Sequence, residues 1–240
     1  RLYVRLIKAE FRKTITEAVR YYPDYIVGFV TDILFFCIIL YTEGNQLEKL
    51  LSYTLWILVN GVIAEASVAI STEKQLGTLQ NLMIQSYSIF QIITVKTAVW
   101  FGIHFLKAFL ILLLGSIFIK TQIPLHLEYL FILFFVCLGS MGLSYLFSAL
   151  TLVFTKTASF VNIFGYVLLF LSGAILPVSP RFSYTNPLSQ GVRCLRALLK
   201  RQSMTKDFSL LFLICMIWLF VGGFLFTVVF KRSKQFRWTY

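Results

Sequence analysis

Residues 97–119 read TAVWFGIHFLKAFLILLLGSIFI, a run of 23 residues in which Lys107 is the only charged side chain. About 20 consecutive apolar residues are enough for a helix to cross the hydrocarbon core of a bilayer. Similar blocks lie at about 25–41, 50–70, 129–154, 160–176 and 208–230. The sequence therefore predicts an all-α membrane protein with six transmembrane helices.

The composition supports this class for the whole chain, which we treat as one domain, residues 1–240. Of its 240 residues, 58% are hydrophobic and only 13% are charged, which excludes an ordinary soluble domain. The net charge is +12. Because the basic residues flank apolar blocks, they indicate anchoring at a membrane surface and not nucleic-acid binding.

Residues 1–23 have the pattern of an amphipathic helix that lies at the membrane interface. Apolar residues recur at helical spacing on one face, and basic residues recur on another: Ile7, Phe11, Ile15 and Val19, against Arg1, Arg5, Lys8 and Arg12. Such a helix buries its apolar face while Lys and Arg reach the lipid headgroups. Membrane lipid is thus an expected partner.

Basic residues also predict the orientation. The first 20 residues hold six of them, and the tail KRSKQFRWTY at 231–240 holds four. With six spans both termini share one side, and the positive-inside rule places them in the cytoplasm of a cell whose plasma membrane holds the protein. Residues 71–96 are then cytoplasmic and residues 177–207 external. The external segment is itself basic, which opposes the rule; helical spacing there indicates an interfacial helix.

The polar stretch STEKQLGTLQNLMIQSYS, residues 71–88, separates two apolar blocks. Leu79, Leu82 and Met83 share one helical face, as expected for a short helix that docks on a soluble partner. An ordinary interfacial loop helix gives the same pattern.

Two motifs carry a family resemblance. EKQLGTLQNL, with Glu73, Gly77, Thr78, Leu79 and Leu82, resembles the E-x-x-x-G-T-L-x-x-L pattern of type II ABC exporter permeases. The segment 171–199 is similar to that family's S-G-x-x-x-P followed by N-P-L and an arginine. Its matching site residues are Gly173, Pro177, Asn186, Pro187 and Arg193.

The resemblance implies several properties. The first motif, with Met83, would contact a soluble ABC ATPase subunit, and the second would form an external re-entrant segment between the fifth and sixth spans. A second permease chain would complete the pathway, and the direction would be export. The chain has no phosphate-binding loop, so ATP and magnesium are expected in the partner, and this chain is expected to be neither an enzyme nor a cofactor carrier. A composition rich in Phe, Ile and Lys fits a bacterial source.

Polar residues inside the spans raise a further question, because charges there are costly. Asp32 could pair structurally with Lys107, or Asp32, His104 and Lys107 could form the proton relay of an ion-coupled secondary transporter. No second ligand is spaced to make His104 a metal site. A non-transport accessory or immunity module is another alternative.

Four residues in the second and fifth spans are candidates for the translocation pathway: Trp56, Asn60, Asn162 and Phe164. An aromatic, weakly polar pathway suits a drug, an amphipathic peptide or a lipid-linked molecule. Contacts between helices would explain the same residues. Gly139, Gly142, Gly222 and Gly223 predict close helix packing.

Overall fold

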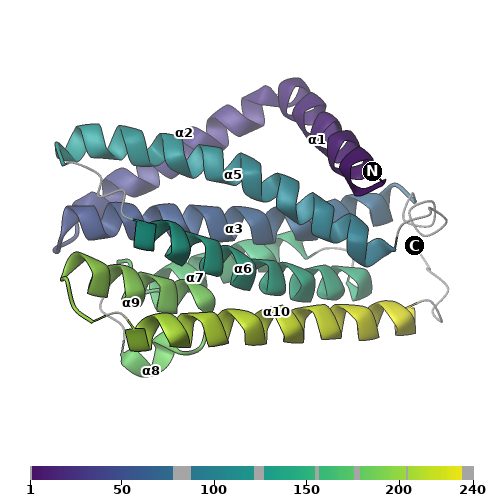
Figure 1. Cartoon of the computed structure of the whole chain (residues 1–240). Coiled ribbons are helices and arrows are strands. Elements are labelled where there is room, and N and C mark those ends of the chain that lie inside the picture. The colour runs from purple at the N-terminus through teal and green to yellow at the C-terminus, as the bar shows by residue number, and fades with distance from the viewer. Residues whose placement is uncertain are drawn as a thin grey trace.

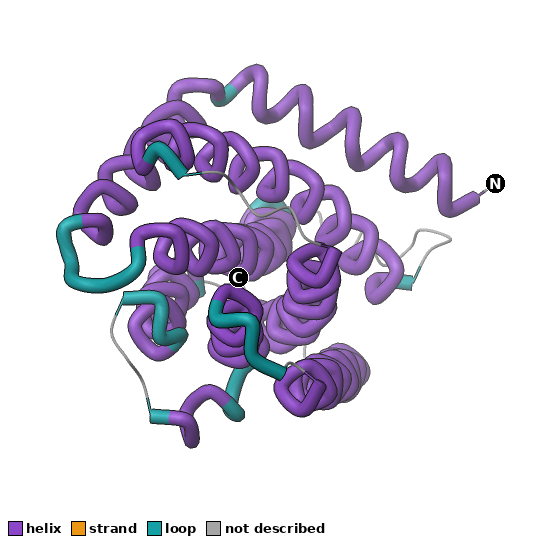
Figure 2. The backbone as a smooth tube through the Cα atoms, turned by 60° about the vertical axis from the view of Figure 1, so that its left-hand side comes forward, coloured by secondary structure: helices purple, strands orange, loops and turns teal. Residues whose placement is uncertain are grey.

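The computed structural model describes residues 2–77, 88–121, 127–154, 157–175, 179–203 and 205–233, and the regular structure within them is entirely helical (Figures 1 and 2). The prediction of an all-α protein is confirmed. The helices are α1 (Leu2–Arg20), α2 (Tyr22–Leu40), α3 (Gln46–Gln75), α5 (Ile89–Ile119), α6 (Leu127–Val153), α7 (Ala158–Leu171), α8 (Pro180–Ser183), α9 (Pro187–Leu199) and α10 (Thr205–Ser233).

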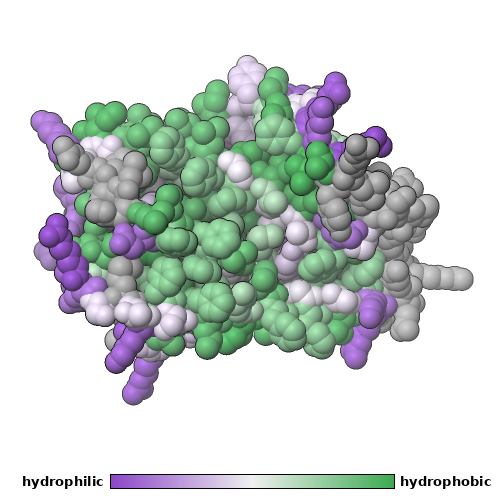
Figure 3. Space-filling view, viewed as in Figure 1, coloured by the Kyte–Doolittle hydropathy of each residue, from purple (hydrophilic) through white to green (hydrophobic). Residues whose placement is uncertain are grey.

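Within these ranges, five helices are long and apolar enough to cross a membrane: α2, α3, α5, α6 and α10. The face seen in Figure 3 has a broad apolar belt with hydrophilic residues gathered at its two ends. This distribution is that of a protein whose middle contacts hydrocarbon and whose ends contact water. The chain is therefore a multi-pass membrane protein.

The block at 160–176 does not form a full-length span among the described residues. α7 has 14 residues, which corresponds to about 21 Å of helix, short of the roughly 30 Å hydrocarbon core. The helix ends because Gly173 adopts a left-handed conformation with φ 81° and the Ser172 hydroxyl accepts a hydrogen bond from the Ala174 amide. Apolar composition alone does not reveal these local hydrogen bonds.

Two helices run beyond the apolar blocks that predicted them. α3 continues to Gln75, and α5 begins at Ile89 and not near Thr97. The start of α5 is fixed by a capping box, in which the Ser88 hydroxyl and the Gln91 side chain each accept from the other residue's amide. Hydropathy marks the apolar part of a helix, whereas caps mark where it ends.

The core is built around α3, which packs against α5, α6, α7 and α9. α6 and α10 form the closest pair, and glycines allow their backbones to touch. A Cβ on Gly222 would lie 2.0 Å from the Gly142 carbonyl oxygen, and one on Gly142 would lie 2.3 Å from the backbone of Trp218. The predicted close packing is confirmed at these two glycines.

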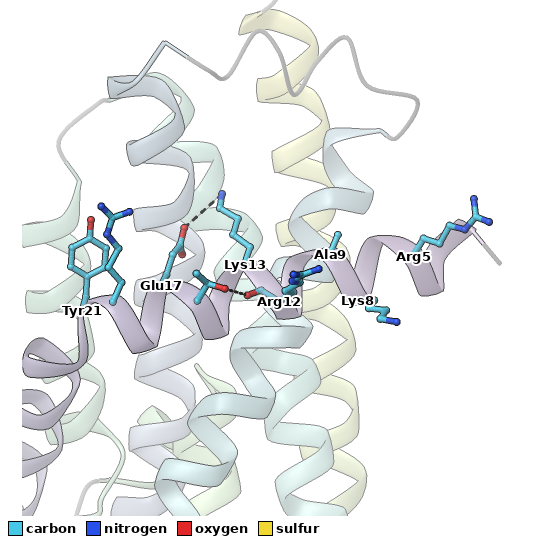
Figure 4. Close-up of a pocket in the computed structure, with 9 residues that line it drawn as sticks. Arg5, Lys8, Ala9, Arg12, Lys13, Glu17 and Tyr21 are labelled. Carbon is cyan, nitrogen blue, oxygen red and sulfur yellow. Dashed lines mark hydrogen bonds and ion pairs between the residues drawn. The ribbon is translucent and has the colours of Figure 1, made fainter.

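The molecule has two distinct ends (Figure 1). The C-terminal end of α3, the start of α5, the C-terminal end of α10 and α1 gather at one end, which we call the Glu73 end. The start of α3 lies with α8 and α9 at the opposite end, which we call the Arg196 end. α1 runs crosswise to the helices behind it (Figure 4).

Candidate functional site

Glu73 lies in the last turn of α3 and joins two other helices. Its Oε1 is 3.4 Å from Nζ of Lys13 on α1 and 3.4 Å from Nζ of Lys96 on α5. We call these three residues the Glu73 cluster. The pair with Lys96 is the better shielded, because the Lys96 side chain is 10% exposed and that of Lys13 is 49% exposed. Shielding from water strengthens an ion pair.

The neighbouring residue, Lys74, contacts a fourth helix, α6. Its Nζ donates to the carbonyl oxygens of Leu152 and Val153, at 2.9 and 3.5 Å. These carbonyls belong to the last turn of α6, where backbone acceptors have no partner within the helix and the helix dipole favours a cation. Glu73 and Lys74 thus tie α1, α5 and α6 to the end of α3.

Lys13 is positioned by a set of carboxylates. Partial burial lowers the pKa of Lys13, but the carboxylates of Glu73, Glu17 and Glu10 outweigh this effect and raise the pKa above its ordinary value. Lys13 also lies 3.9 Å from Glu17, one turn along α1. The ammonium group therefore stays charged at neutral pH and keeps its attraction to Glu73.

A second hydrophobic cluster, separate from the main core, lies at the same end. Its buried members come from α3, α5, α6 and α10: Ile70, Ile89, Ile93, Tyr145, Ala149, Leu152 and Phe226. The Tyr145 ring stacks on Phe90 with centroids 4.8 Å apart, and its hydroxyl lies 2.7 Å from that of Thr94. The four helix ends are therefore packed together, so a displacement of one is felt by the others.

Gly77 ends α3 with φ 68°, the left-handed conformation common just after a helix. Its amide donates to the Lys74 carbonyl. The motif residues that follow Gly77, namely Thr78, Leu79, Leu82 and Met83, lie outside the described residues. Glu73 and Gly77 are the predicted coupling residues whose geometry is defined.

The Arg196 end also holds ion pairs, which account for part of the unexpected basic charge at 177–207. The Arg196 Nε lies 2.6 Å from Glu48 at the start of α3, and its guanidinium also donates to the Gly173 carbonyl. Arg193 lies 3.1 Å from Asp207 of α10. A second interaction of Arg193 is with Tyr184, whose hydroxyl is 2.9 Å away.

The predicted re-entrant residues have clear local roles, apart from Pro177, which lies outside the described residues. Asn186 caps α9, since its side-chain oxygen accepts from the Ser189 amide, and Pro187 is the first residue of the helix. α9 does not lie on the surface as an ordinary interfacial helix would. It packs against α3, α6 and α10, and Leu188 and Leu195 are completely buried.

The four candidate pathway residues have different surroundings in the described part of the chain. Trp56 is buried and donates from Nε1 to the Gly165 carbonyl at 2.7 Å. The Asn60 oxygen packs on the same glycine, and Phe164 stacks obliquely on Phe147, 4.7 Å away. Asn162 is exposed. In one chain, then, Trp56 and Asn60 join α3 to α7, and their part in a pathway stays a prediction.

The intramembrane charges are partly paired. Lys107 of α5 lies 2.5 Å from the Asp32 carboxylate on α2, which supports the structural reading of these two residues. The His104 ring packs against Gly61 and near Trp100. Its two nitrogens are buried without a hydrogen-bond partner among the described residues. His104 is therefore not hydrogen-bonded into a relay with Asp32 and Lys107.

Sequence reasoning gave no role to Lys13, Lys96 or Lys74, although it singled out Glu73 beside them. It also missed the pairing of Arg196 with Glu48, which are 148 positions apart. No local pattern marks such partners, because tertiary packing brings them together.

Comparison with known proteins gives the family. The family model described as ABC-2 type transporter matches residues 2–200. A comparison with curated proteins found no match. The matched range includes α1, the Glu73 cluster and all of α9. The chain therefore belongs to the ABC-2 type transporter family and is a membrane permease.

Proposed function

We propose that this chain is the permease subunit of an ATP-driven exporter, and that the Glu73 end receives the motion of a soluble ATPase subunit. The observation that carries this proposal is the connection of Glu73 and Lys74 to α1, α5 and α6. A protein bound to the polar segment after Gly77 would act directly on a point where four helices are joined.

The mechanism that we propose uses that geometry. ATP and magnesium bind in the partner, whose closure pushes or pulls on residues 71–96. Because the helix ends share ion pairs and a packed apolar cluster, they move together and shift the permease between inward- and outward-open states. The chain itself supplies no catalytic group. The substrate class that we propose is lipophilic or amphipathic: a drug, a peptide or a lipid-linked molecule.

The topology that we propose has six crossings, with α7 as a short fifth one and residues 177–207 as an external re-entrant segment. Both termini are then cytoplasmic, at the plasma membrane of a bacterium. The placement of α1 and the end of α10 at the Glu73 end agrees with this arrangement (Figure 1). A second permease chain, identical or related, would complete the pathway and cover part of the exposed apolar surface of α2 and α7.

An ion-coupled transporter is less well supported. Its titratable core would be Asp32, His104 and Lys107, but Asp32 and Lys107 neutralise each other in an ion pair. An accessory module that holds a partner without transport has no observation in its favour.

The test is a pull-down of the tagged full chain from native membranes. Glu73→Arg combined with Leu79→Asp places a repelling charge against Lys13 and Lys96 and removes an apolar anchor of the motif. We expect the unaltered chain to retain an ATPase and the double variant to lose it. Glu48→Arg is the matched control, since it reverses the same charge at the Arg196 end.

The outcomes separate the possibilities. Loss of the ATPase from the double variant alone supports coupling through the Glu73 end. Equal loss from Glu48→Arg would mean general misfolding, which size-exclusion chromatography of both variants detects. If the correctly inserted unaltered chain retains no ATPase, the proposal of an ATP-driven exporter is wrong.

A further inference from the structure

An open groove of about 760 Å³ lies along α1. The described residues that line it are Arg5, Lys8, Ala9, Arg12, Lys13, Thr16, Glu17, Arg20 and Tyr21. Five of these side chains are cationic and one is anionic. The close-up shows this row on a helix that runs across the others (Figure 4).

Most of these cations have no carboxylate to neutralise them. Lys13 pairs with Glu17 and Glu73. Among the described residues, no ion pair forms with the other four cations: Arg5, Lys8, Arg12 and Arg20. All four are exposed. Four uncompensated cations on one helix produce a strong positive potential that attracts anions.

The same helix exposes an apolar stripe. Val4, Phe11, Ile15 and Val19 are between 44% and 69% exposed, although they recur at helical spacing and would favour an apolar environment. Thr14, in contrast, is a polar residue that is buried against the bundle. Within the described part of the chain, α1 is thus attached by its Thr14 side and through Lys13, while its apolar stripe is largely exposed and the other four cations of its groove form no ion pair.

We infer that this groove is a binding site for the phosphate headgroups of anionic phospholipids. A lipid supplies both features that α1 lacks, an acyl chain for the stripe and a phosphate for the cations. From Arg5 to Arg20 the helix rises about 22 Å, which accommodates several headgroups side by side. Arginine forms paired hydrogen bonds with phosphate, so the groove is expected to retain a bound headgroup and not only to attract it by charge.

Other anionic partners fit less well. A nucleic acid or an acidic protein surface would satisfy the cations but would leave the apolar stripe in water. The position of the stripe, on a helix that lies across a bundle of membrane-spanning helices, puts it at the level where lipid headgroups meet acyl chains. The occupant is therefore a lipid of the surrounding leaflet.

The experiment measures lipid retention by the full chain. The purified protein is exposed in detergent to equal amounts of phosphatidylglycerol and phosphatidylcholine, washed, and its bound lipid quantified. The test variant is Arg5→Gln/Lys8→Gln/Arg12→Gln/Arg20→Gln. The matched control removes four exposed cations at the opposite end: Arg181→Gln/Lys200→Gln/Arg201→Gln/Lys206→Gln.

We expect the unaltered chain and the control to bind more phosphatidylglycerol than phosphatidylcholine. In the test variant this preference should fall at least about tenfold, since each basic residue near an anionic surface contributes substantially to the binding free energy. High salt should weaken the retention because the cations are exposed. If the quadruple variant does not fold, Arg5→Gln and Arg12→Gln alone must each give a partial loss.

Three results would overturn the inference. The first is no preference for phosphatidylglycerol in the unaltered chain, and the second is equal loss in the control. The third is displacement of the lipid by soluble glycerophosphate or by polyglutamate, which would indicate a free phosphate ester or an acidic protein as the occupant. None of these results bears on ATPase binding at the Glu73 end, so the proposed function is tested separately.

Discussion

Glu73 at the end of α3 lies 3.4 Å from Lys96 near the start of α5, although the polar stretch between their helices separates them in the sequence. Both side chains are largely shielded from water. The ion pair therefore holds the end of α3 against the start of α5. Whatever binds this connection acts on α3 and α5 together.

Glu73→Gln should lower the stability of the chain by about 2 kcal/mol, because it leaves the largely buried Lys96 without its counter-charge. A lower thermal-unfolding midpoint in detergent would measure this loss. Glu43→Gln, at an exposed position, should leave the midpoint almost unchanged. Equal midpoints for the two variants would show that the Glu73 cluster contributes nothing to stability.

Gly77→Ala should weaken the end of α3, since a left-handed residue with a Cβ costs about 1 kcal/mol. Asn tolerates this conformation better, so Gly77→Asn should be milder. Gly102→Ala is the control, because Gly102 is helical and a Cβ there meets nothing within 4 Å. Thermal unfolding and ATPase retention are the two measurements. A Gly77→Ala variant as stable as Gly102→Ala would contradict the assigned turn.

Gly222→Ala should force α6 and α10 apart and destabilise the chain by about 1–3 kcal/mol, the usual range for overpacking. The adjacent Gly223 is an internal control, since its Cβ would lie 3.7 Å from Phe90 at ordinary contact distance. Gly223→Ala should therefore be close to neutral. The yield of monodisperse protein and its unfolding midpoint distinguish the two, and a reversed order of stability would refute the close approach at Gly142.

Asp32→Asn should destabilise the chain by about 3 kcal/mol, because it leaves Lys107 unpaired within the membrane. The double variant Asp32→Asn/Lys107→Met removes both charges and should recover most of the stability. Asp24→Asn, at an exposed residue near the start of α2, serves as the control. A stable double variant that has lost transport would favour the ion-coupled alternative over a structural pair.

The sequence was most informative where hydropathy reports directly on the environment. Five apolar blocks correspond to helices long enough to cross a membrane, because a bilayer imposes a minimum length of apolar helix. The glycines of α6 and α10 were also foreseeable, since small residues permit close approach. The length of α7 was not, because the turn at Ser172 and Gly173 depends on local hydrogen bonds within an apolar stretch.

The candidate site was predictable only in part. Glu73 and Gly77 could be selected from a motif, but Lys13 and Lys96 could not, because their roles arise from the way α1 and α5 meet the end of α3. Similarly, the arginines near α9 looked anomalous in the sequence. Arg196 and Arg193 are balanced by Glu48 and Asp207, two acidic residues that belong to other helices.

The short α7 has a consequence for the membrane itself. Its outer surface is apolar, with Phe160, Ile163, Tyr166, Val167 and Phe170 exposed, yet it is about 9 Å shorter than the hydrocarbon core. As the fifth crossing proposed above, α7 would require the lipids beside it to compress, and such a hydrophobic mismatch costs a fraction of a kcal/mol for each ångström. Covering α7 with protein would relieve that compression, which supports the proposed second permease chain at this face.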